Sequence, residues 1–436
     1  MEPWMVASII GVGLIALLMT GMPVAFALMG LSALFLLVFV GPTALFMVVA
    51  AAFKQVGSEV FIAIPLFVLM AAVLQSSGIS EALYHTMHMW MGSLRGGLTV
   101  GTLVICAIID ALSGIGATAT TTMGVIALPE MLKRGYHKHM AVGAITVGGA
   151  LGPLIPPSVL MIIVGGYAQL SVGKLFVGGI LPGLLVTAAW SAYVIGRCSI
   201  RRDYGPPMPK AEQGTLGQKI LALRHVILPL GLAAFIMAGI YTGAFTPTEA
   251  AGFGALGAII ISIIHRKFSL VNMKEALQLA MRVSCMILWL VIGGGCYSAL
   301  VTVTGTSHLV MEVLSGLPFG TSGILLVMLV IVLFMGMFID PVAISMICIP
   351  VFLPITQSMG VDPLWFALMF VMAVVIGYIT PPFGLNLFYM KGVTPEDITI
   401  MDIYRSATPY TVIMVGCLLL CFLFPQIMVW LPSFMK

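Results

Sequence analysis

Charged residues are nearly absent from long stretches of this sequence. They make up 8% of its 436 residues, while hydrophobic residues make up 61%. A soluble domain typically carries about 25% charged residues, so a chain this apolar needs the hydrocarbon interior of a membrane around it. The length allows roughly a dozen crossings of about 20 residues each. The sequence therefore predicts an all-α, polytopic integral membrane protein.

Two of the apolar segments are too long for a single crossing. The segments 97–134 and 321–359 are interrupted near their middles, at Asp110–Gly114 and at Asp340-Pro341. We interpret each as a re-entrant hairpin, in which two half-helices enter and leave the membrane by the same face. The other predicted spans are 4–20, 23–40, 58–78, 139–165, 176–196, 225–241, 249–264, 282–303, 364–390 and 406–430.

The two halves of the chain carry matching features in the same order, at offsets of 224–230 residues. Each half has five full crossings, an odd number, so the second half begins on the opposite side of the membrane. This pattern predicts two inverted repeats, 1–200 and 225–436, joined by a linker at 201–224. Amphipathic stretches at 43–57 and 268–281 are expected to form one interfacial arm helix in each half. The matching pairs are Pro23 and Pro247, Ser77-Gly78 and Thr304-Gly305, Asp110 and Asp340, and Ile155-Pro156-Pro157-Ser158 and Thr380-Pro381-Pro382-Phe383.

Basic residues are distributed unevenly between the two sides of the predicted topology. Placing the basic loop 197–224 in the cytoplasm puts 16 of the 19 Lys and Arg residues on the cytoplasmic side. Only Lys54, Lys174 and Lys436 fall elsewhere. This bias is what the positive-inside rule expects. We therefore expect a multi-pass protein of the bacterial inner membrane with both termini in the periplasm.

Four helix interruptions lie at membrane depth: the two hairpin tips and the two Pro-Pro sites. Non-helical backbone is tolerated there only when it is buried in protein or lines a wet cavity. Unpaired carbonyls and hydroxyls suit a sodium ion, and the N-termini of half-helices suit an anionic substrate. Inverted symmetry would bring all four interruptions together near the midplane, which predicts a binding site for ion and solute.

The residues beside the four interruptions fit this chemistry. Hydroxyl side chains and glycines dominate, and Asp110 and Asp340 are either ligands or caps of the hairpin helices. The candidates are Ser113, Gly114, Thr118, Thr120 and Thr121 at the first tip; Gly152, Ile155 and Ser158 at the first Pro-Pro site; Gly336, Asp340 and Ser345 at the second tip; and Gly377, Thr380, Gly384 and Asn386 at the second Pro-Pro site.

Several other functions have no support in the sequence. The nucleotide-binding pattern GxxxxGK[ST] and the hydrolase patterns HExxH and GxSxG are absent, which argues against an ATPase or an enzyme. The net charge of +4 arises in loops between spans and does not indicate a nucleic-acid partner. The seven cysteines form no CxxC pair and are expected to be packing residues. No metal cofactor is expected beyond a coupling ion.

At these residues the sequence resembles the large membrane subunit (M, or DctM-like) of tripartite ATP-independent periplasmic (TRAP) transporters. The likeness extends over essentially the whole chain, with the motifs in order. The motifs are Leu112-Ser113-Gly114 with Ala117-Thr118, Leu154-Ile155-Pro156-Pro157-Ser158, Phe245-Thr246-Pro247-Thr248-Glu249-Ala250, Gly336-Met337-Phe338-Ile339-Asp340-Pro341 and Ile379-Thr380-Pro381-Pro382-Phe383-Gly384-Leu385-Asn386.

The resemblance implies a sodium-driven importer of a small organic acid that works as an elevator, with a fold of the ion-transporter superfamily. Its implied partners are a small four-helix membrane subunit (Q), expected as a separate chain, and a periplasmic solute-binding protein (P). One implied sodium site involves Ser113, Gly152, Ile155 and Ser158, and the other involves Gly336, Gly377, Thr380 and Phe383. The implied substrate position lies between them, near Gly114, Thr118, Asp110, Ser345 and Asn386.

The identity of the substrate stays open. The first tip reads Ser-Gly-Ile-Gly-Ala-Thr, where dicarboxylate members tend towards Ser-Gly-Ser-Ser-Pro-Ala-Thr. The Thr-rich version looks like a branch labelled mannitol/chloroaromatic, but the binding protein selects the cargo in such systems. Two other hypotheses are a stand-alone sodium- or proton-coupled anion carrier of a related inverted-repeat family, and a channel or structural membrane scaffold.

Overall fold

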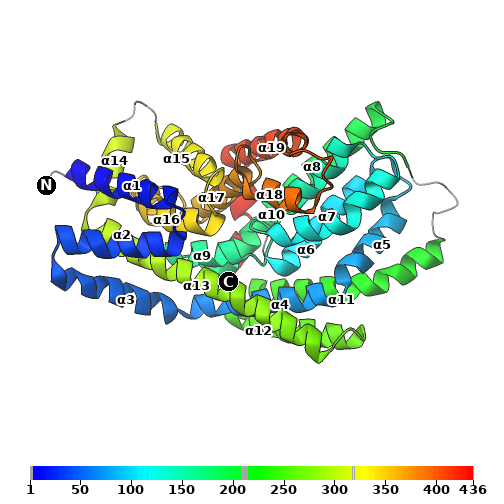
Figure 1. The fold of residues 1–436 in the computed structure, drawn as a ribbon, viewed down its shortest axis with the longest axis horizontal. Coiled ribbons are helices and arrows are strands. Elements are labelled where there is room, and N and C mark those ends of the chain that lie inside the picture. The colour runs from blue at the N-terminus through cyan, green and yellow to red at the C-terminus, as the bar shows by residue number, and fades with distance from the viewer. Residues whose placement is uncertain (1–2, 115, 208–214, 317, 319, 436) are drawn as a thin grey trace.

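The computed structural model describes residues 3–114, 116–207, 215–316, 318 and 320–435, and the regular structure of these residues is entirely helical. In Figure 1 helices α3, α13, α4, α12 and α11 run along one long edge of the molecule, and the other helices pack above them. The helices up to the linker are α1 (Pro3–Met19), α2 (Val24–Phe39), α3 (Leu45–Val56), α4 (Glu59–Ser76), α5 (Ile79–Met91), α6 (Gly97–Ser113), α7 (Gly116–Lys133), α8 (Lys138–Gly148), α9 (Val159–Ala168) and α10 (Val172–Ile200). Those after it are α11 (Leu216–Tyr241), α12 (Pro247–Ile264), α13 (Leu270–Val303), α14 (Thr306–Ser315), α15 (Thr321–Gly336), α16 (Pro341–Ser358), α17 (Pro363–Tyr378), α18 (Leu385–Val393), α19 (Ile400–Leu423) and α20 (Gln426–Val429).

Among the described residues, six helices are long and apolar enough to cross a membrane: α4, α10, α12, α13, α16 and α19. Helix α11 adds a seventh when its two parts, which meet at a 45° bend, are taken as one span. Shorter apolar helices fill most of the other predicted spans. The prediction of an all-helical, multi-span membrane protein is therefore confirmed. Of the basic residues assigned to the cytoplasmic linker, Lys210 lies outside the described residues.

The helices break at the four places where the sequence predicts it. Helix α6 ends at Ser113 and α7 begins at Gly116, and helix α15 ends at Gly336 and α16 begins at Pro341. We call α6 with α7 the first helix pair and α15 with α16 the second; the members of each pair pack against each other. Residues 149–158 separate α8 from α9 (the first break), and residues 379–384 separate α17 from α18 (the second break). Both Pro-Pro bonds in these breaks are cis.

The second arm differs from its prediction. In the first half, Gly57 ends α3 and Ser58 caps α4, so the arm and the span are separate helices. In the second half, 268–281 is not an independent arm, because α13 runs unbroken for 34 residues. No glycine or proline stands near its expected boundary at 281–282. At about 1.5 Å per residue this helix is about 50 Å long, well over the hydrocarbon thickness of a bilayer.

Two helices lie in segments between the predicted spans, where no helix was predicted. Helix α5 occupies most of 79–96, and α14 occupies the corresponding part of the second half. Each follows a glycine in the left-handed region, Gly78 (φ 71°) and Gly305 (φ 69°). That conformation favours glycine because it has no Cβ. These two glycines, which the repeat pattern had matched, turn the chain into the helix that precedes each pair.

The match between Asp110 and Asp340 is wrong. Asp110 lies in the last turn of α6, whereas Asp340 is the N-cap residue of α16, after the tip of its pair. Helices α7 and α16 begin at Gly116 and Pro341, 225 residues apart, the same offset that relates the two Pro-Pro sites. With this offset of 225 residues, Asp110 and Asp340 do not occupy equivalent positions, although both lie beside a hairpin tip.

The core of the molecule is built around α17. Its side chains are buried from Trp365 to Tyr378 on every face, and it packs against α15, α16, α19, α10 and α9. Large exposed apolar side chains lie instead on peripheral helices, for example Phe53 on α3 and Val271 on α13. An exposed surface this apolar is what a protein in contact with lipid requires.

Candidate functional site

A cavity of about 130 Å³ lies between the two helix pairs, the first break and the helices on either side of the second break. Its walls come from elements far apart in the sequence, including α7 and α16 of the pairs, the first break with α9, the end of α17 and the middle of α18. Helix α13, from the row along the long edge of the molecule, closes one side. The lining residues are Gly114, Gly116, Ala117, Pro153, Val159, Leu160, Val283, Met286, Ile287, Asp340, Pro341, Val342, Tyr378 and Tyr389.

Three helices begin at this cavity. The first residues of α7 (Gly116), α9 (Val159) and α16 (Pro341) all line it. The N-terminus of a helix carries unpaired N–H groups and the positive end of the helix dipole. Neither lysine nor arginine is among the lining residues. Asp340 is the one acidic residue among them, so any positive potential that favours an anionic group there has to come from the main-chain dipoles of these helix N-termini.

The caps of two of these helices hold the tips in place. Asp340 accepts a hydrogen bond from the Val342 N–H (2.8 Å) at the start of α16. Ser158 accepts one from the Met161 N–H (3.3 Å) at the start of α9, and its hydroxyl donates to the Pro153 carbonyl (2.7 Å). Of the two roles left open for Asp340, the structure thus places it in the capping geometry.

The first helix pair fits closely onto the first break. Gly114 ends α6 with φ 63°, and a Cβ there would lie 2.9 Å from the carbonyl oxygen of Pro157. A Cβ on Gly116 would lie 2.7 Å from the Gly149 oxygen. Glycine at both positions therefore lets the backbone of the tip touch the backbone of the break.

The second helix pair makes a similar close contact with the last turn of α17, just before the second break. A Cβ on Gly377 would lie 2.6 Å from the Cα of Gly336, so α15 and α17 touch through their backbones. Thr380 donates its hydroxyl hydrogen to the Ile376 carbonyl (2.5 Å) just beyond the end of α17. Phe383 is half exposed, and its ring stacks on Phe388 of α18 at 6.2 Å between centroids.

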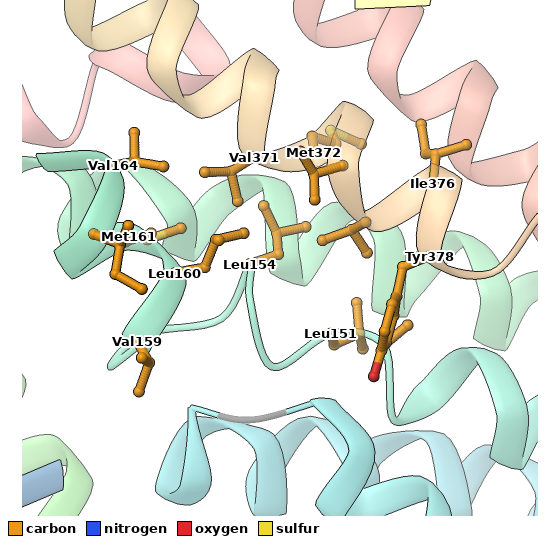
Figure 2. Close-up of a cluster of buried hydrophobic side chains, with 14 of the residues drawn as sticks. Leu151, Leu154, Val159, Leu160, Met161, Val164, Val371, Met372, Ile376 and Tyr378 are labelled. Atoms are coloured by element: carbon orange, nitrogen blue, oxygen red, sulfur yellow. The ribbon is translucent and has the colours of Figure 1, made fainter. Parts of the chain in front are cut away.

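Tyr378 links the two halves of the site. In Figure 2 it extends from the end of α17 past Leu151 of the first break, with its hydroxyl oxygen directed away from α17. Its ring lies 3.4 Å from the position of a Cβ on Gly116. The residue is buried, but its hydroxyl makes no hydrogen bond to the described residues and lines the cavity.

The predicted substrate residues do not all come together. Gly114 lines the cavity, but Thr118 lines a separate small cavity of about 20 Å³ with Ser113. Ser345 is buried within α16 and donates its hydroxyl hydrogen to the Pro341 carbonyl (2.9 Å). Asn386 is buried as well and donates to the Thr146 carbonyl, while its Oδ1 has no partner among the described residues.

Asp110 also lies away from the main cavity. It is fully buried, and its carboxylate faces the N–H groups of Leu151 and Gly152 in the first break. Neither oxygen reaches hydrogen-bonding geometry with a described residue. The structure thus brings Asp110 and Gly152 together, and it joins α6 to the break by a contact that the sequence pattern did not predict.

The residues of each implied sodium site do gather in one region. Ser113, Gly152 and Ser158 lie at the contact between the first helix pair and the first break, and Ile155 packs from this break against Gly183. In the second set, Gly336 touches Gly377, and the Thr380 N–H donates to the Gly377 carbonyl. The Phe383 ring packs against Phe338 of the second tip. Both sets offer carbonyl and hydroxyl oxygens, the ligands that a hard cation prefers. No group of three or more His, Cys, Asp or Glu residues that would hold a metal occurs within the described ranges.

Sequence reasoning missed the lining residues of α13, α17 and α18. Val283, Met286 and Ile287 carry no motif, and Tyr389 lies beyond the second break. Tyr378 had the clearest signal, since it stands two residues before Thr380 at the end of a fully apolar helix.

The comparisons with known proteins agree with this architecture. Residues 12–427 match the family described as the DctM component of tripartite ATP-independent periplasmic transporters. The isethionate TRAP transporter permease DctMQ of Oleidesulfovibrio alaskensis is 32% identical over 94% of this chain; the chain spans 64% of that relative. The C4-dicarboxylate permease DctM of Rhodobacter capsulatus is 30% identical over 96% of this chain and 97% of its own length. The sialic acid permease SiaM of Vibrio cholerae is 28% identical over 98% of both chains.

Two solved structures share the fold at low sequence identity. The YdaH transporter of Alcanivorax borkumensis aligns over 90% of both chains with a TM-score of 0.66 and 15% identity. MtrF of Neisseria gonorrhoeae aligns over 87% of this chain and 84% of its own, with a TM-score of 0.60 and 12% identity. The chain thus shares its fold with these two membrane proteins. The match to the permease family and to the DctM relative makes it a transport permease and not an enzyme. The chain belongs to the DctM family, the large permease component of TRAP transporters.

Proposed function

We propose that this protein is the permease subunit that carries a small organic acid across the bacterial inner membrane, driven by a sodium gradient. A periplasmic solute-binding protein delivers the substrate, and a small four-helix membrane subunit completes the complex. The relatives named for isethionate, C4-dicarboxylates and sialic acid support an organic acid as the cargo. The relative in which both membrane subunits are named together supports the four-helix partner.

The observation that carries the proposal is the convergence of three helix N-termini on one cavity. A carboxylate or sulfonate placed between α7, α9 and α16 would receive main-chain N–H groups from α7 and α9. Helix α16 would contribute the positive end of its dipole, because Pro341 has no N–H and the Val342 N–H is bonded to Asp340. Tyr378 and Tyr389 line the same space, and their hydroxyls would add hydrogen-bond donors. Recognition by dipoles in place of a fixed cation leaves the bound anion free to depart, which a carrier requires.

The coupling ions would bind at the two tip-to-break contacts. The first site uses oxygens of Ser113, Gly152, Ile155 and Ser158, and the second uses those of Gly336, Gly377, Thr380 and Phe383. Each set spans a helix pair and a break, so an ion bound there would hold the two together. The cavity between these elements would then be fully assembled only when sodium is bound. This dependence would couple transport of the solute to the sodium gradient.

The movement we propose is that of an elevator built from inverted repeats, residues 1–200 and 225–436, with both pairs re-entrant and both termini periplasmic. The two helix pairs and the two broken helices form the moving part. Helices α1–α4 and α11–α13 form the scaffold. The cavity lies at their boundary, because α13 supplies one wall and the pairs supply the others.

Transport in proteoliposomes tests the proposal. The chain is reconstituted with the small membrane subunit, and uptake of labelled substrate is measured with the binding protein and an inward sodium gradient. Uptake should need both and should stop when potassium replaces sodium. Uptake that needs neither sodium nor a binding protein would overturn the mechanism.

Two variants test the ion sites. Thr380→Ala and Ser113→Ala should raise the sodium concentration required for half-maximal uptake. Thr408→Ala is the matched control, because Thr408 donates the same type of bond, to the carbonyl four residues earlier, on α19.

A second candidate is a stand-alone anion carrier. The shared fold with MtrF favours it, since MtrF is described as representing a class of efflux pumps. Affinity purification of the tagged chain from its own cell membrane distinguishes the two. A one-to-one complex with a small four-helix protein supports the first proposal, and uptake by the chain alone supports the second.

A further inference from the structure

A second cavity, of about 160 Å³, lies well away from the first, where α8 and α19 begin and α10 ends. These three helices lie side by side in Figure 1. Arg197 of α10, Arg405 of α19 and His139 of α8 line it, together with the rings of Tyr193 and Tyr204. No carboxylate is among the lining residues. The cavity is therefore rich in donors and positively charged.

Lys138, beside the cavity, is already paired with a carboxylate, and His139 lies 4.0 Å from the same carboxylate, whereas the two arginines that line the cavity have no ion pair among the described residues. Lys138 forms an ion pair with Asp402 (2.8 Å), which also caps the start of α19 through Thr399. His139 shares a hydrogen bond with Ser406 (2.9 Å). Arg197, in contrast, has a buried Nε without a hydrogen-bond partner among the described residues. A buried donor left unpaired is unfavourable, so a ligand that accepts its hydrogen bond would stabilise the protein.

Aromatic stacking holds this arrangement in shape. The ring of Tyr204 stacks on His137 with 4.2 Å between centroids and 2° between planes. The guanidinium groups of Arg197 and Arg201 lie over the same ring at 5.2 Å and 5.6 Å. Burial and the neighbouring His139 lower the pKa of His137, so this histidine is neutral at pH 7. The arginines supply the charge, and Tyr204 fixes their position.

We propose that this cavity binds a phosphate-bearing anion, supplied by the headgroup of an acidic phospholipid or by free phosphate. An arginine presents a planar fork of donors that matches the oxygens of phosphate. The location also fits a lipid. The cavity lies at the basic ends of the helices, and large apolar side chains are exposed next to it, such as Ile200 on α10 and Val412 on α19. Basic pockets between membrane helices on the cytoplasmic side commonly hold anionic headgroups.

The test uses the full chain in nanodiscs of phosphatidylcholine alone or of phosphatidylcholine and phosphatidylglycerol in equal parts. Arg197→Gln and Arg405→Gln should each weaken retention of phosphatidylglycerol, measured by native mass spectrometry, on the order of tenfold. Arg202→Gln is the control, because Arg202 is exposed in the loop that follows α10 and does not line the cavity. Arg197→Lys keeps the positive charge but lacks the planar set of guanidinium donors. It should therefore retain more phosphatidylglycerol than Arg197→Gln and less than wild type.

Thermal unfolding with inorganic phosphate separates the two sources. A lipid ligand is supported if wild type and Arg202→Gln retain phosphatidylglycerol and the Arg197 and Arg405 variants lose it. Saturable protection by phosphate, lost in the same variants and without lipid retention, supports a soluble ligand. Equal behaviour of wild type, Arg405→Gln and Arg202→Gln with both probes would overturn the proposal. Arg405 is exposed, so its variant keeps the test valid even where Arg197→Gln unfolds.

Discussion

Gly336 and Gly377 bring α15 and α17 into backbone contact. A Cβ on Gly336 would lie 2.9 Å from the Cα of Gly377, and a Cβ on Gly377 would lie 2.6 Å from the Cα of Gly336. No side chain fits between the two helices at this point. The contact joins the second helix pair to the last turn of α17, just before the second break, where we place one sodium ion.

Gly377→Ala is expected to force these helices apart. Overpacking of this kind destabilises by about 1–3 kcal/mol, and the displaced carbonyls should also weaken sodium binding. Thermal unfolding and the sodium dependence of uptake measure the two effects. Gly392→Ala is the control, since a Cβ at Gly392 has no atom within 4 Å. Equal stability of the two variants would show that the contact is looser than described.

Gly114→Ala should disturb the first tip in two ways. The left-handed conformation of Gly114 costs a residue with a Cβ about 1–2 kcal/mol, and the new methyl group would press on the Pro157 oxygen. Gly135 has a similar φ of 78° but open space around it, so Gly135→Ala isolates the conformational effect. We expect uptake to fall markedly in Gly114→Ala only. If both variants transport equally well, the contact with Pro157 has no role in transport.

Asp340 caps α16, and two substitutions separate its cap from its charge. Asp340→Ala removes the acceptor for the Val342 N–H and should lower the free energy of unfolding by about 1 kcal/mol. Asp340→Asn keeps an acceptor and should remain close to wild type in stability. Chemical denaturation of both variants in mild detergent provides the measurement. A loss in Asp340→Asn as large as that in Asp340→Ala would mean that the charge, not the cap, is what matters.

Tyr378→Phe should affect the substrate and leave the fold intact. The Tyr378 hydroxyl has no hydrogen-bond partner among the described residues, so its removal breaks no bond within the protein. We expect stability within about 0.5 kcal/mol of wild type. We also expect a KM for uptake raised about fivefold or more, as for the loss of one hydrogen bond of about 1 kcal/mol. An unchanged KM would remove the hydroxyl from the binding site.

The breaks were predictable because their causes are local. Pro156-Pro157 and Pro381-Pro382 cannot continue a helix, and the Ser113-Gly114 and Asp340-Pro341 steps carry ordinary end and start signals of helices. The continuity of α13 was harder to predict, since an amphipathic stretch followed by an apolar one looks the same whether the helix bends or not.

The cavity itself was only partly predictable. Gly114 and Asp340 were found through their motifs, but Met286 and Ile287 line it because α13 packs across the pairs, and no local pattern encodes that packing. Asp110 was matched to Asp340 by a sequence offset that ignored helix register. Thr118, Ser345 and Asn386 are hydroxyl or amide residues near the breaks, and only the tertiary structure decides that they face elsewhere.

The most direct test fills the cavity from one of its own helices. Ala117 lines the cavity near the start of α7, and Val125, further along the same helix, is exposed. With sodium and the binding protein present, Ala117→Trp should reduce the initial rate of uptake by roughly tenfold or more, because the indole occupies the space of the solute and of the three helix N-termini. Val125→Trp should transport at close to the wild-type rate. Wild-type uptake by a folded Ala117→Trp variant would show that the solute passes elsewhere.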